Sequence, residues 1–395
     1  MPTDPFNAFL DGPQVPVKNA KSGPLAGLSL GVKDIFDVAG YVSGWGNPVR
    51  AAEAGAAEVS APAVQALLDA GARFAGKTQT EELAFSMVGQ NVHFPHPVNP
   101  AAPDRITGGS SSGSAAAVAG GLADIATGSD TGGSIRAPAG FCGLIGLRTT
   151  FGAISLDGTM PLAPSFDTFG WFARDGELYE KVGHVLLPVP GRPLRRPRLL
   201  RSALLDELPF GPAELDEYGR MAGLVGERFG SARPAGTPPY SIDELYWCTR
   251  KLQAHEAWAA HGAWIESADR RLGKATFDRF AFGRTVTDQD VKDETARRTV
   301  FRRWLGDLLA DDGILVLPTT PCAAPRSDST PEEFGAFRER AIRMLCWSGL
   351  SGFPQITVPL GAVDGAPFGI SLLGPAGSDL ALIAKARELL ESSTT

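Results

Sequence analysis

The chain has 395 residues, of which 43% are hydrophobic and 21% are charged, and it carries a formal net charge of −7 at pH 7. This apolar content is enough to bury a sizeable core, which excludes an intrinsically disordered chain. The acidic balance, without a long run of Lys and Arg, argues against a nucleic-acid or anionic-membrane surface, so the expected partner is a small molecule.

Cysteine usage and the lack of long apolar runs indicate the compartment. Cys142, Cys248, Cys322 and Cys346 lie far apart and form no C-x-x-C pair, which predicts free thiols and neither a disulfide framework nor a zinc site. No apolar run approaches the roughly 20 residues of a membrane span, and the first residues do not read as a secretory signal. We therefore expect a cytoplasmic protein that uses no membrane, no metal and no cofactor.

The first part of the chain predicts short strands alternating with helices. Residues 1–23 are polar and broken by prolines, which indicates a surface lead-in. Residues 28–33 alternate apolar with small or polar residues, and they predict a strand that ends at Lys33. Further along we expect a helix capped at Ser60 and running to Ala70, a strand over 73–76, and a helical or irregular segment over 81–87.

One segment matches a nucleotide-binding motif. Residues 71–78 fit the P-loop pattern G-x-x-x-x-G-K-T, whose mechanism requires a strand before the first glycine and a helix from the lysine onward. Here the order is inverted, because a helical pattern precedes Gly71 and a strand-like run follows it. We therefore interpret Gly71 as the glycine that ends a helix, and the match as coincidental.

Glycine and serine gather in residues 107–138. Two turns, 108–113 and 132–134, flank the alanine-rich residues 114–119, which predict a short, close-packed helix. Glycines let successive backbone N–H groups approach a ligand and form an anion-binding concavity, which is the shape of an oxyanion hole. A single such cluster is usually a flexible linker, but two turns in fixed register favour a site.

Two details of this stretch need separate interpretation. Residues 109–113 also satisfy the nucleophile pattern G-x-S-x-G, which would select Ser111, but that motif requires a buried strand before it and residues 102–105 are not one. Asp130 and Arg136 lie on either side of the second turn, and we expect them to form its hydrogen-bonding frame.

The rest of the chain predicts strands interrupted by a mostly helical region. Prolines between 188 and 197 mark a break into this variable region. Extended elements are expected at 142–148, 166–174, 314–318, 355–358 and 368–373. Helices are expected at 177–187, 213–229, 248–272, 289–310, 331–346 and 378–391.

Three segments carry a resemblance: Gly31-Val32-Lys33-Asp34, Gly108-Gly109-Ser110-Ser111, and Asp130-Thr131-Gly132-Gly133-Ser134-Ile135-Arg136. Together they resemble the amidase signature family, densely over residues 24–185 and more loosely over 313–392, whereas residues 195–300 resemble nothing known to us. The resemblance implies a single α/β domain over residues 1–395, with a large mixed β-sheet flanked by helices on both faces.

The resemblance also implies roles for individual residues. Ser134 would be the nucleophile, Ser110 a bridging serine in a cis peptide, and Lys33 the base. A lysine can act as a base only if burial disfavours its charged form, so Lys33 must be neutral at rest. The oxyanion would be held by the backbone N–H groups of Thr131, Gly132, Gly133 and Ser134.

Within the family, the chain looks most like the short plant-type amidases that hydrolyse indole-3-acetamide. We expect a small primary amide, an arylacetamide or an indole-3-acetamide-like compound, to be hydrolysed through an acyl-enzyme to a carboxylate and ammonia. Phe85, Met87 and Ser111 are candidate contacts to the substrate, and no unpaired basic cluster is evident that would hold a charged acyl group. Further apolar candidates for the pocket are Met160, Phe166, Cys346 and Trp347.

Other readings of the same motifs stay open. A glutamine-amidotransferase-type subunit would need a partner, and activity of the isolated chain distinguishes it. A non-catalytic amidase-like binding protein would lack the nucleophile, whereas Ser134, Ser110 and Lys33 are all present. An esterase would use the same site, because an ester is an easier acyl donor. Besides the small-molecule amide, a homodimer remains open as a partner.

Overall fold

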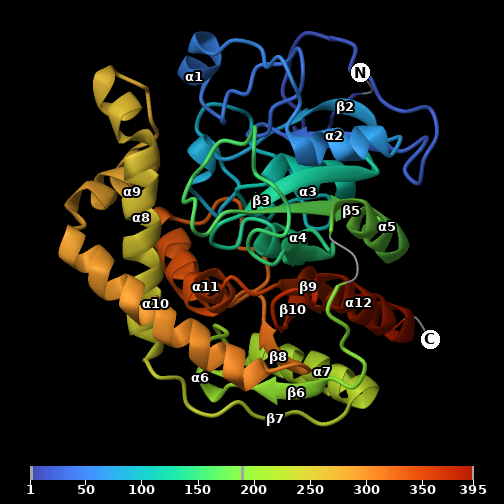
Figure 1. Cartoon of the computed structure of the whole chain (residues 1–395), viewed down its shortest axis with the longest axis vertical. Helices are drawn as coiled ribbons and strands as arrows, with labels where there is room; N and C mark the ends of the chain where they lie inside the picture. Colours follow the sequence, from blue (N-terminus) through green and yellow to red (C-terminus); the bar gives the residue numbers. More distant parts are fainter. Residues whose placement is uncertain (1–2, 188–190, 394–395) are drawn as a thin grey trace.

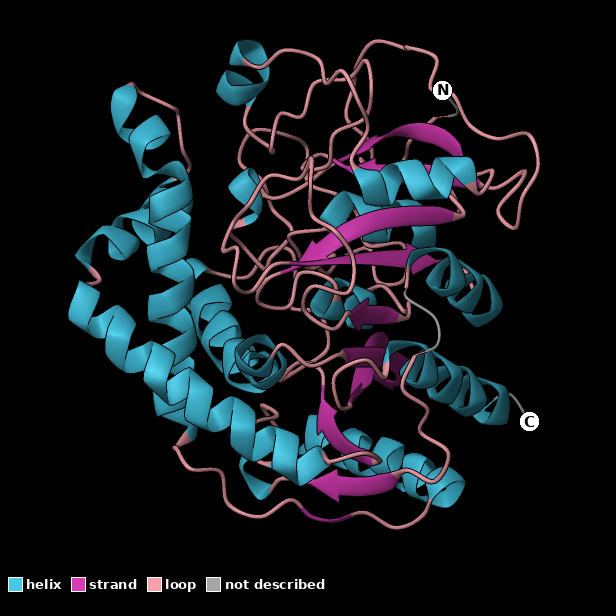
Figure 2. Ribbon diagram, viewed as in Figure 1, coloured by secondary structure: helices cyan, strands magenta, loops and turns pink. Residues whose placement is uncertain are grey.

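The computed structural model describes residues 3–187 and 191–393 and has an α/β architecture (Figures 1 and 2). Its first sheet has the strand order β2 (Arg73–Thr78), β1 (Ser29–Lys33), β3 (Ile125–Asp130) and β5 (Thr168–Ala173). β1 is parallel to both β2 and β3, and β5 is antiparallel to β3. The sheet therefore holds the carboxyl ends of β1 and β3, and the turns that follow them, at one edge.

The second sheet has six strands, β4 (Gly146–Arg148), β9 (Gln355–Val363), β10 (Ala366–Leu373), β8 (Gly313–Pro318), β6 (Arg198–Arg201) and β7 (Arg233–Pro234), in that order. The strands from β4 to β8 pair antiparallel, whereas β8, β6 and β7 run parallel. Three strands from the last part of the chain thus lie between strands from its middle.

The predicted fold class, α/β with a mixed sheet flanked by helices, is confirmed, but the sheet is divided in two. The two sheets adjoin where β5 contacts β4. The contact is close at Gly170, where a Cβ atom would lie 3.0 Å from the carbonyl oxygen of Leu147. Glycine therefore lets these two strands approach each other at the junction.

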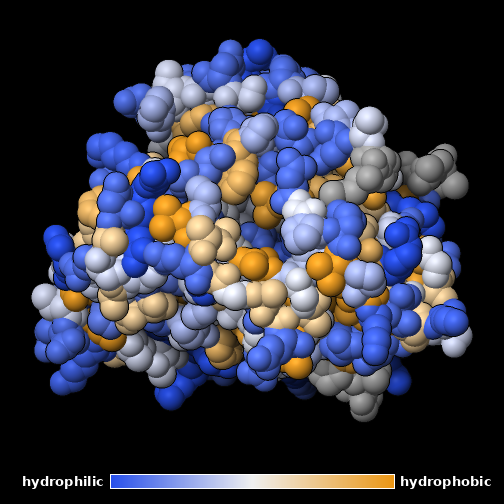
Figure 3. All heavy atoms as spheres, turned by 90° about the horizontal axis from the view of Figure 1, so that it is seen from above, coloured by the Kyte–Doolittle hydropathy of each residue, from blue (hydrophilic) through white to orange (hydrophobic). Residues whose placement is uncertain are grey.

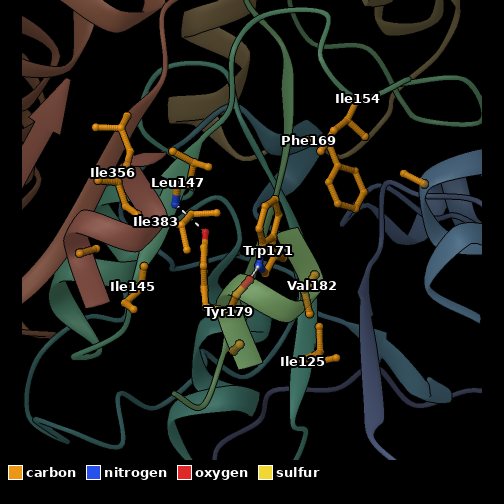
Figure 4. Close-up of a cluster of buried hydrophobic side chains, with 14 of the residues drawn as sticks. Ile125, Ile145, Leu147, Ile154, Phe169, Trp171, Tyr179, Val182, Ile356 and Ile383 are labelled. Carbon is orange, nitrogen blue, oxygen red and sulfur yellow. Dashed lines mark hydrogen bonds between the residues drawn. The ribbon is translucent and has the colours of Figure 1, made fainter. Parts of the chain in front are cut away.

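A cluster of buried hydrophobic side chains packs where the two sheets adjoin (Figure 4). The Trp171 and Tyr179 rings stack with their centroids 4.9 Å apart, and the Trp171 indole donates to the Tyr179 carbonyl oxygen at 3.2 Å. The Tyr179 hydroxyl accepts a 2.7 Å hydrogen bond from the backbone N–H of Leu147. One tyrosine on a helix thereby connects the edges of both sheets, with its polar tip satisfied inside an apolar core.

Several helices pack directly against the sheets. Those that contact strands or one another on this part of the fold are α2 (Pro62–Asp69), α3 (Ser112–Ala119), α4 (Arg136–Phe141), α5 (Gly176–Leu186), α7 (Pro212–Phe229) and α12 (Asp379–Ser393). α3 contacts β1 and β3, and α4 contacts β9 and β10. The short α1 (Pro48–Glu53) and α6 (Ala203–Asp206) and a 3₁₀ turn (Glu82–Ala84) complete this part.

Four helices form a group at the left of Figure 1, α8 (Ile242–Ser267), α9 (Lys274–Thr285), α10 (Asp288–Leu309) and α11 (Pro331–Ser351). The predicted helical region supplies α8, α9 and the start of α10, whereas its first helix, α7, packs against β9 of the second sheet. Capping boxes start three of these helices, Ser241 with Glu244, Thr287 with Asp290, and Thr330 with Glu333. Each box satisfies backbone N–H groups that a helix start leaves unpaired. α8, which contacts the other three helices, is the centre of the group.

Some element boundaries differ from the expectations. The predicted strand over 142–148 is strand only from Gly146, because α4 runs to Phe141 and a turn follows it. α2 begins after Ala61 with no side-chain cap, since the Ser60 hydroxyl accepts a hydrogen bond from Ala39 instead. The predicted break at 188–197 starts with residues 188–190, which lie outside the described residues, as do residues 1 and 2 of the lead-in.

α9 was not expected from the sequence, for a physical reason. Its buried residues are Thr276, Phe280 and Gly283, so its inner face shows no continuous apolar stripe. A Cβ at Gly283 would lie 2.0 Å from the Ala254 carbonyl oxygen of α8, so the two helices approach with glycine at the contact.

Hydrophilic and hydrophobic residues are interspersed over the face seen from above (Figure 3). Among the helices described, none is both long and apolar enough to cross a lipid bilayer. The four cysteines are free thiols, as expected.

Candidate active site

Lys33 lies at the carboxyl end of β1 with its side chain fully buried. Its Nζ is 2.8 Å from Ser110 Oγ, 2.8 Å from Ser129 Oγ and 3.1 Å from Ser111 Oγ. Its backbone N–H donates to Thr127 Oγ1 at 3.0 Å. The neighbouring strand β3 thus presents Thr127 and Ser129, two residues apart on one face, to the lysine.

The environment of Lys33 changes its protonation. Burial lowers the pKa of Lys33 from 10.5 to about 7, and Asp130, Asp167 and Glu81 oppose this shift by their negative charges. Loss of hydration disfavours the ammonium form more than these carboxylates favour it. Near neutral pH a substantial share of Lys33 is therefore an uncharged amine that can accept a proton.

Ser110 is held by the first glycine-rich turn, just before α3. The Gly109–Ser110 peptide bond is cis, as the resemblance implied. The Ser110 carbonyl oxygen accepts hydrogen bonds of 3.1 Å from the Glu81 N–H and from Thr80 Oγ1. Gly109 has no room for a side chain, since a Cβ there would lie 2.9 Å from both Glu81 Cγ and the Gly89 nitrogen. The turn is therefore fixed on both sides.

The second turn is organised by the buried Asp130 carboxylate. It accepts hydrogen bonds from the backbone N–H groups of Gly133 at 2.9 Å, Ile135 at 3.2 Å and Arg136 at 3.3 Å. The Arg136 guanidinium adds two bonds of 2.9 Å, one to each carboxylate oxygen. Burial alone would raise the pKa of Asp130, but Arg136 and then Arg148 lower it below the ordinary range. The expected hydrogen-bonding frame is confirmed.

The backbone N–H groups of this turn are not equivalent. That of Gly133 already donates to Asp130 at 2.9 Å, so this expected oxyanion donor is not free. Within the described part of the chain, the N–H groups of Thr131, Gly132 and Ser134 have no acceptor, and the Ser134 hydroxyl forms no hydrogen bond. Gly133 has a φ of +129°, and a Cβ there would lie 2.5 Å from Leu345 Cδ1. The turn therefore requires glycine at this position.

Ser134 opens onto a narrow pocket. Its lining residues are Ala84, Phe85, Ser86, Met87, Thr131, Gly132, Ser134, Leu162, Gln253, Arg338 and Ile342. Phe85 and Met87, two of the predicted substrate contacts, are among these lining residues. Ser111 does not line the pocket, because it is fully buried behind Lys33 and hydrogen-bonded to Ser129.

The other apolar candidates are core residues. Met160, Phe166, Cys346 and Trp347 are all buried, and none of them lines the pocket at Ser134. Leu162 and Ile342 take their place in the pocket wall.

The segment that matches the P-loop pattern has the order of elements predicted from the sequence, a helix before Gly71 and a strand after it. Gly71 follows α2 with a φ of +104°, and residues 73–78 are strand β2, so no helix begins at Lys77. Lys77 is buried, with its Nζ 2.5 Å from the Phe36 carbonyl oxygen and 3.4 Å from Asp34 Oδ1. Lys77 is thus a structural residue of the fold.

Sequence reasoning missed four residues of this site. Ser129 stands two residues after Thr127 on strand β3 beside Lys33, and the sequence analysis did not predict this strand. Asp167 accepts from Thr131 Oγ1 at 2.6 Å and helps to hold the second turn. Gln253 and Arg338 come from α8 and α11, and no local pattern places either helix against Ser134.

Known proteins resemble this chain along nearly its whole length. Residues 12–185 match the family model described as Amidase. The chain is 34% identical, over 98% of its length, to Amidase 1 of Oryza sativa subsp. japonica, of which it covers 95%. It is 36% identical, over 96% of its length, to Outer envelope protein 64, chloroplastic, of Arabidopsis thaliana, of which it covers 69%. A crystal structure described as an amidase superimposes with a TM-score of 0.82 at 29% identity, over 94% of this chain and 85% of that one.

Proposed function

This chain belongs to the amidase family, and from that premise we propose that it hydrolyses a small primary amide through Ser134, Ser110 and Lys33. One observation carries the proposal: a fully buried lysine with a pKa lowered to about 7 lies 2.8 Å from the Ser110 hydroxyl. A neutral amine in this position is a base able to activate a serine without a histidine.

In the proposed reaction, Ser134 Oγ attacks the amide carbonyl carbon while its proton passes through Ser110 to Lys33. The tetrahedral intermediate collapses when the same route returns the proton to the amide nitrogen, and ammonia leaves. Water then attacks the acyl carbon and gives its proton to Lys33 through Ser110. The ester bond to Ser134 Oγ breaks, the proton returns to Ser134, and the carboxylate is released. The mechanism requires the Ser134 hydroxyl to donate to Ser110 when substrate is bound, and catalytic hydrogen bonds of this kind often form or tighten only in the substrate complex.

We assign the oxyanion hole to the backbone N–H groups of Thr131, Gly132 and Ser134. These three have no acceptor among the described residues, whereas the Gly133 N–H is engaged by Asp130. Fixed donors aimed at the developing oxyanion stabilise the transition state without reorganisation. Asp130 thereby acts indirectly, because it holds the turn that presents them.

The side chains that line the pocket next to Ser134 indicate which kind of acyl group it accepts. Phe85, Met87 and Leu162 are apolar, and Phe85 is held edge-on to Phe280 with ring centroids 5.0 Å apart. This lining supports an acyl group that is apolar next to the carbonyl, of the arylacetamide or indole-3-acetamide kind. Such a pocket discriminates by about 1 to 3 kcal/mol per methylene-sized difference, so the preference is expected to be graded.

The proposal is tested by ammonia release from phenylacetamide and indole-3-acetamide by the isolated chain. Ser134→Ala should lower turnover by several orders of magnitude, and Ser155→Ala, at an exposed serine, is the matched control. Retained turnover in Ser134→Ala would contradict the assignment. Ammonia release from glutamine, but from none of the simple amides, would favour the amidotransferase-type reading.

A further inference from the structure

Three arginines from three helices lie together where the pocket of Ser134 meets a larger one. Arg250 is on α8, Arg279 on α9 and Arg338 on α11. Arg338 lines both pockets, and Arg279 lines the larger one beside it. Of the described residues that line the pocket of Ser134, Arg338 alone carries a charge. No such cluster is evident in the sequence, because the helices that bring these arginines together are far apart along the chain.

These arginines have no carboxylate partner among the described residues. Arg338 forms no hydrogen bond or ion pair there, and Arg250 donates to the Tyr246 hydroxyl at 2.8 Å. Arg279 donates to Thr276 Oγ1 at 3.3 Å, while its buried Nε has no acceptor. The guanidinium of Arg279 lies 6.0 Å from the ring centre of Phe85, so this charge borders the same pocket wall.

The nearby carboxylates are occupied by other groups. Glu81 accepts from the backbone N–H groups of Gly89 and Gln90. Glu82 accepts from Asn47 Nδ2 at 2.8 Å and lies 2.7 Å from His93 Nε2. Neither one forms an ion pair with the arginine cluster, although Glu81 and Glu82 face the larger pocket.

Gathering like charges in a partly buried place is unfavourable. Burial first, and then Arg279 and Arg250, lower the pKa of Arg338 well below its ordinary value. By contrast, Arg343 on the same helix is paired with Asp243 at 2.8 Å. A guanidinium kept unpaired beside a reactive serine suits a ligand that brings its own negative charge, and its planar fork matches a carboxylate.

We propose that Arg338, supported by Arg279, binds a carboxylate at the far end of the acyl group, so that the preferred substrates are monoamides of dicarboxylic acids with an apolar spacer. This inference rests on the proposed function and specifies its substrate class. The reaction is the same hydrolysis: the amide C–N bond breaks, a C–O bond to water forms, the nitrogen leaves as ammonia, and the distant carboxylate is unchanged. The apolar wall holds the spacer and Arg338 is the specificity-determining residue.

Matched substrate pairs test the proposal. Phenylacetamide is compared with its 4-carboxy derivative, and pentanamide with glutaramate, in the wild type, Arg338→Gln and Arg338→Lys. We expect the wild type to favour the carboxylate in at least one pair by about 10- to 100-fold in kcat/KM, the range for a hydrogen bond to a charged group. Arg338→Gln should remove the preference through KM, so that kcat/KM becomes equal within each pair, and Arg338→Lys should retain part of the preference.

Two controls separate this inference from the reaction itself. Arg340→Gln removes a neighbouring arginine that lies over the Phe210 ring and should change neither pair. Calorimetric binding of the 4-carboxy amide to Ser134→Ala, with and without Arg338→Gln, measures recognition without turnover and should weaken about 10- to 100-fold. Equal kcat/KM within both pairs, or equal binding with and without Arg338, would overturn the substrate class even if amide hydrolysis is observed. Absence of all hydrolysis, with Arg338-dependent binding retained, would overturn the proposed reaction alone.

Discussion

The protonation of Lys33 predicts how the stability of the protein depends on pH. Folding lowers the pKa of this lysine from 10.5 to about 7. Between these two values the unfolded chain holds a proton that the folded chain has released, so raising the pH stabilises the folded state. The burial of the charged Lys33 lowers the free energy of unfolding by its full amount below about pH 7. This loss disappears above about pH 10.5, where the lysine is neutral in both states.

The perturbation is Lys33→Met, which keeps the length of the side chain and removes the titrating group. With the two pKa values above, the free energy of unfolding of the wild type should rise, relative to Lys33→Met, by about 2 kcal/mol between pH 7 and pH 9. Urea unfolding followed by tryptophan fluorescence measures this difference at each pH. Lys292→Met, at an exposed lysine, shows what the loss of a lysine does on the surface.

Other titrating groups cancel in the comparison, because the wild type and the variant share them. A difference that stays constant from pH 7 to pH 9 would mean that buried Lys33 keeps its charge. In that case the lysine could not serve as the base, whatever its distance from Ser110.

The remaining predictions concern activity and the frame of the turn. Below about pH 7, kcat/KM should fall about tenfold per pH unit as Lys33 becomes protonated, and Lys33→Arg should be inactive at every pH. A kcat/KM that stays constant down to pH 5 would contradict the role of Lys33 as the base. Ser110→Ala with Lys33→Ala should cost little more than Lys33→Ala alone in single-turnover assays, because residues that act as a unit are not additive; multiplied losses would indicate separate roles. Asp130→Asn should lower the free energy of unfolding, measured by chemical denaturation, by about 3 to 5 kcal/mol, because it leaves buried Arg136 and Arg148 without their anion. A change below about 1 kcal/mol would show that these two ion pairs contribute little to stability.

Local patterns predicted the elements that carry the proposed chemistry. The alternation of residues 28–33 placed Lys33 at the end of a strand, and the glycine-rich turns at Ser110 and Ser134 follow from residues close together in sequence. Glycine at 133 is required by a positive φ, which is a backbone property that sequence alone can suggest.

Features that depend on tertiary contact could not be predicted in the same way. The division of the sheet arises where Gly170 meets Leu147, and neither strand shows this in its own pattern. The engagement of the Gly133 N–H depends on which way the Asp130 carboxylate points. Arg338 was missed because its neighbours in space come from α8 and α9, and each arginine alone looks like a solvated surface charge.

The central claim is that Ser134 is the nucleophile, activated by Ser110 and neutral Lys33. Its most direct test is a fluorophosphonate probe, with the modified residue located by peptide mass spectrometry. The account predicts one adduct, on Ser134, formed faster as the pH rises through about 7 and lost in Lys33→Ala. An adduct on any other residue, or labelling of Ser134 that is unaffected by Lys33→Ala, would contradict it.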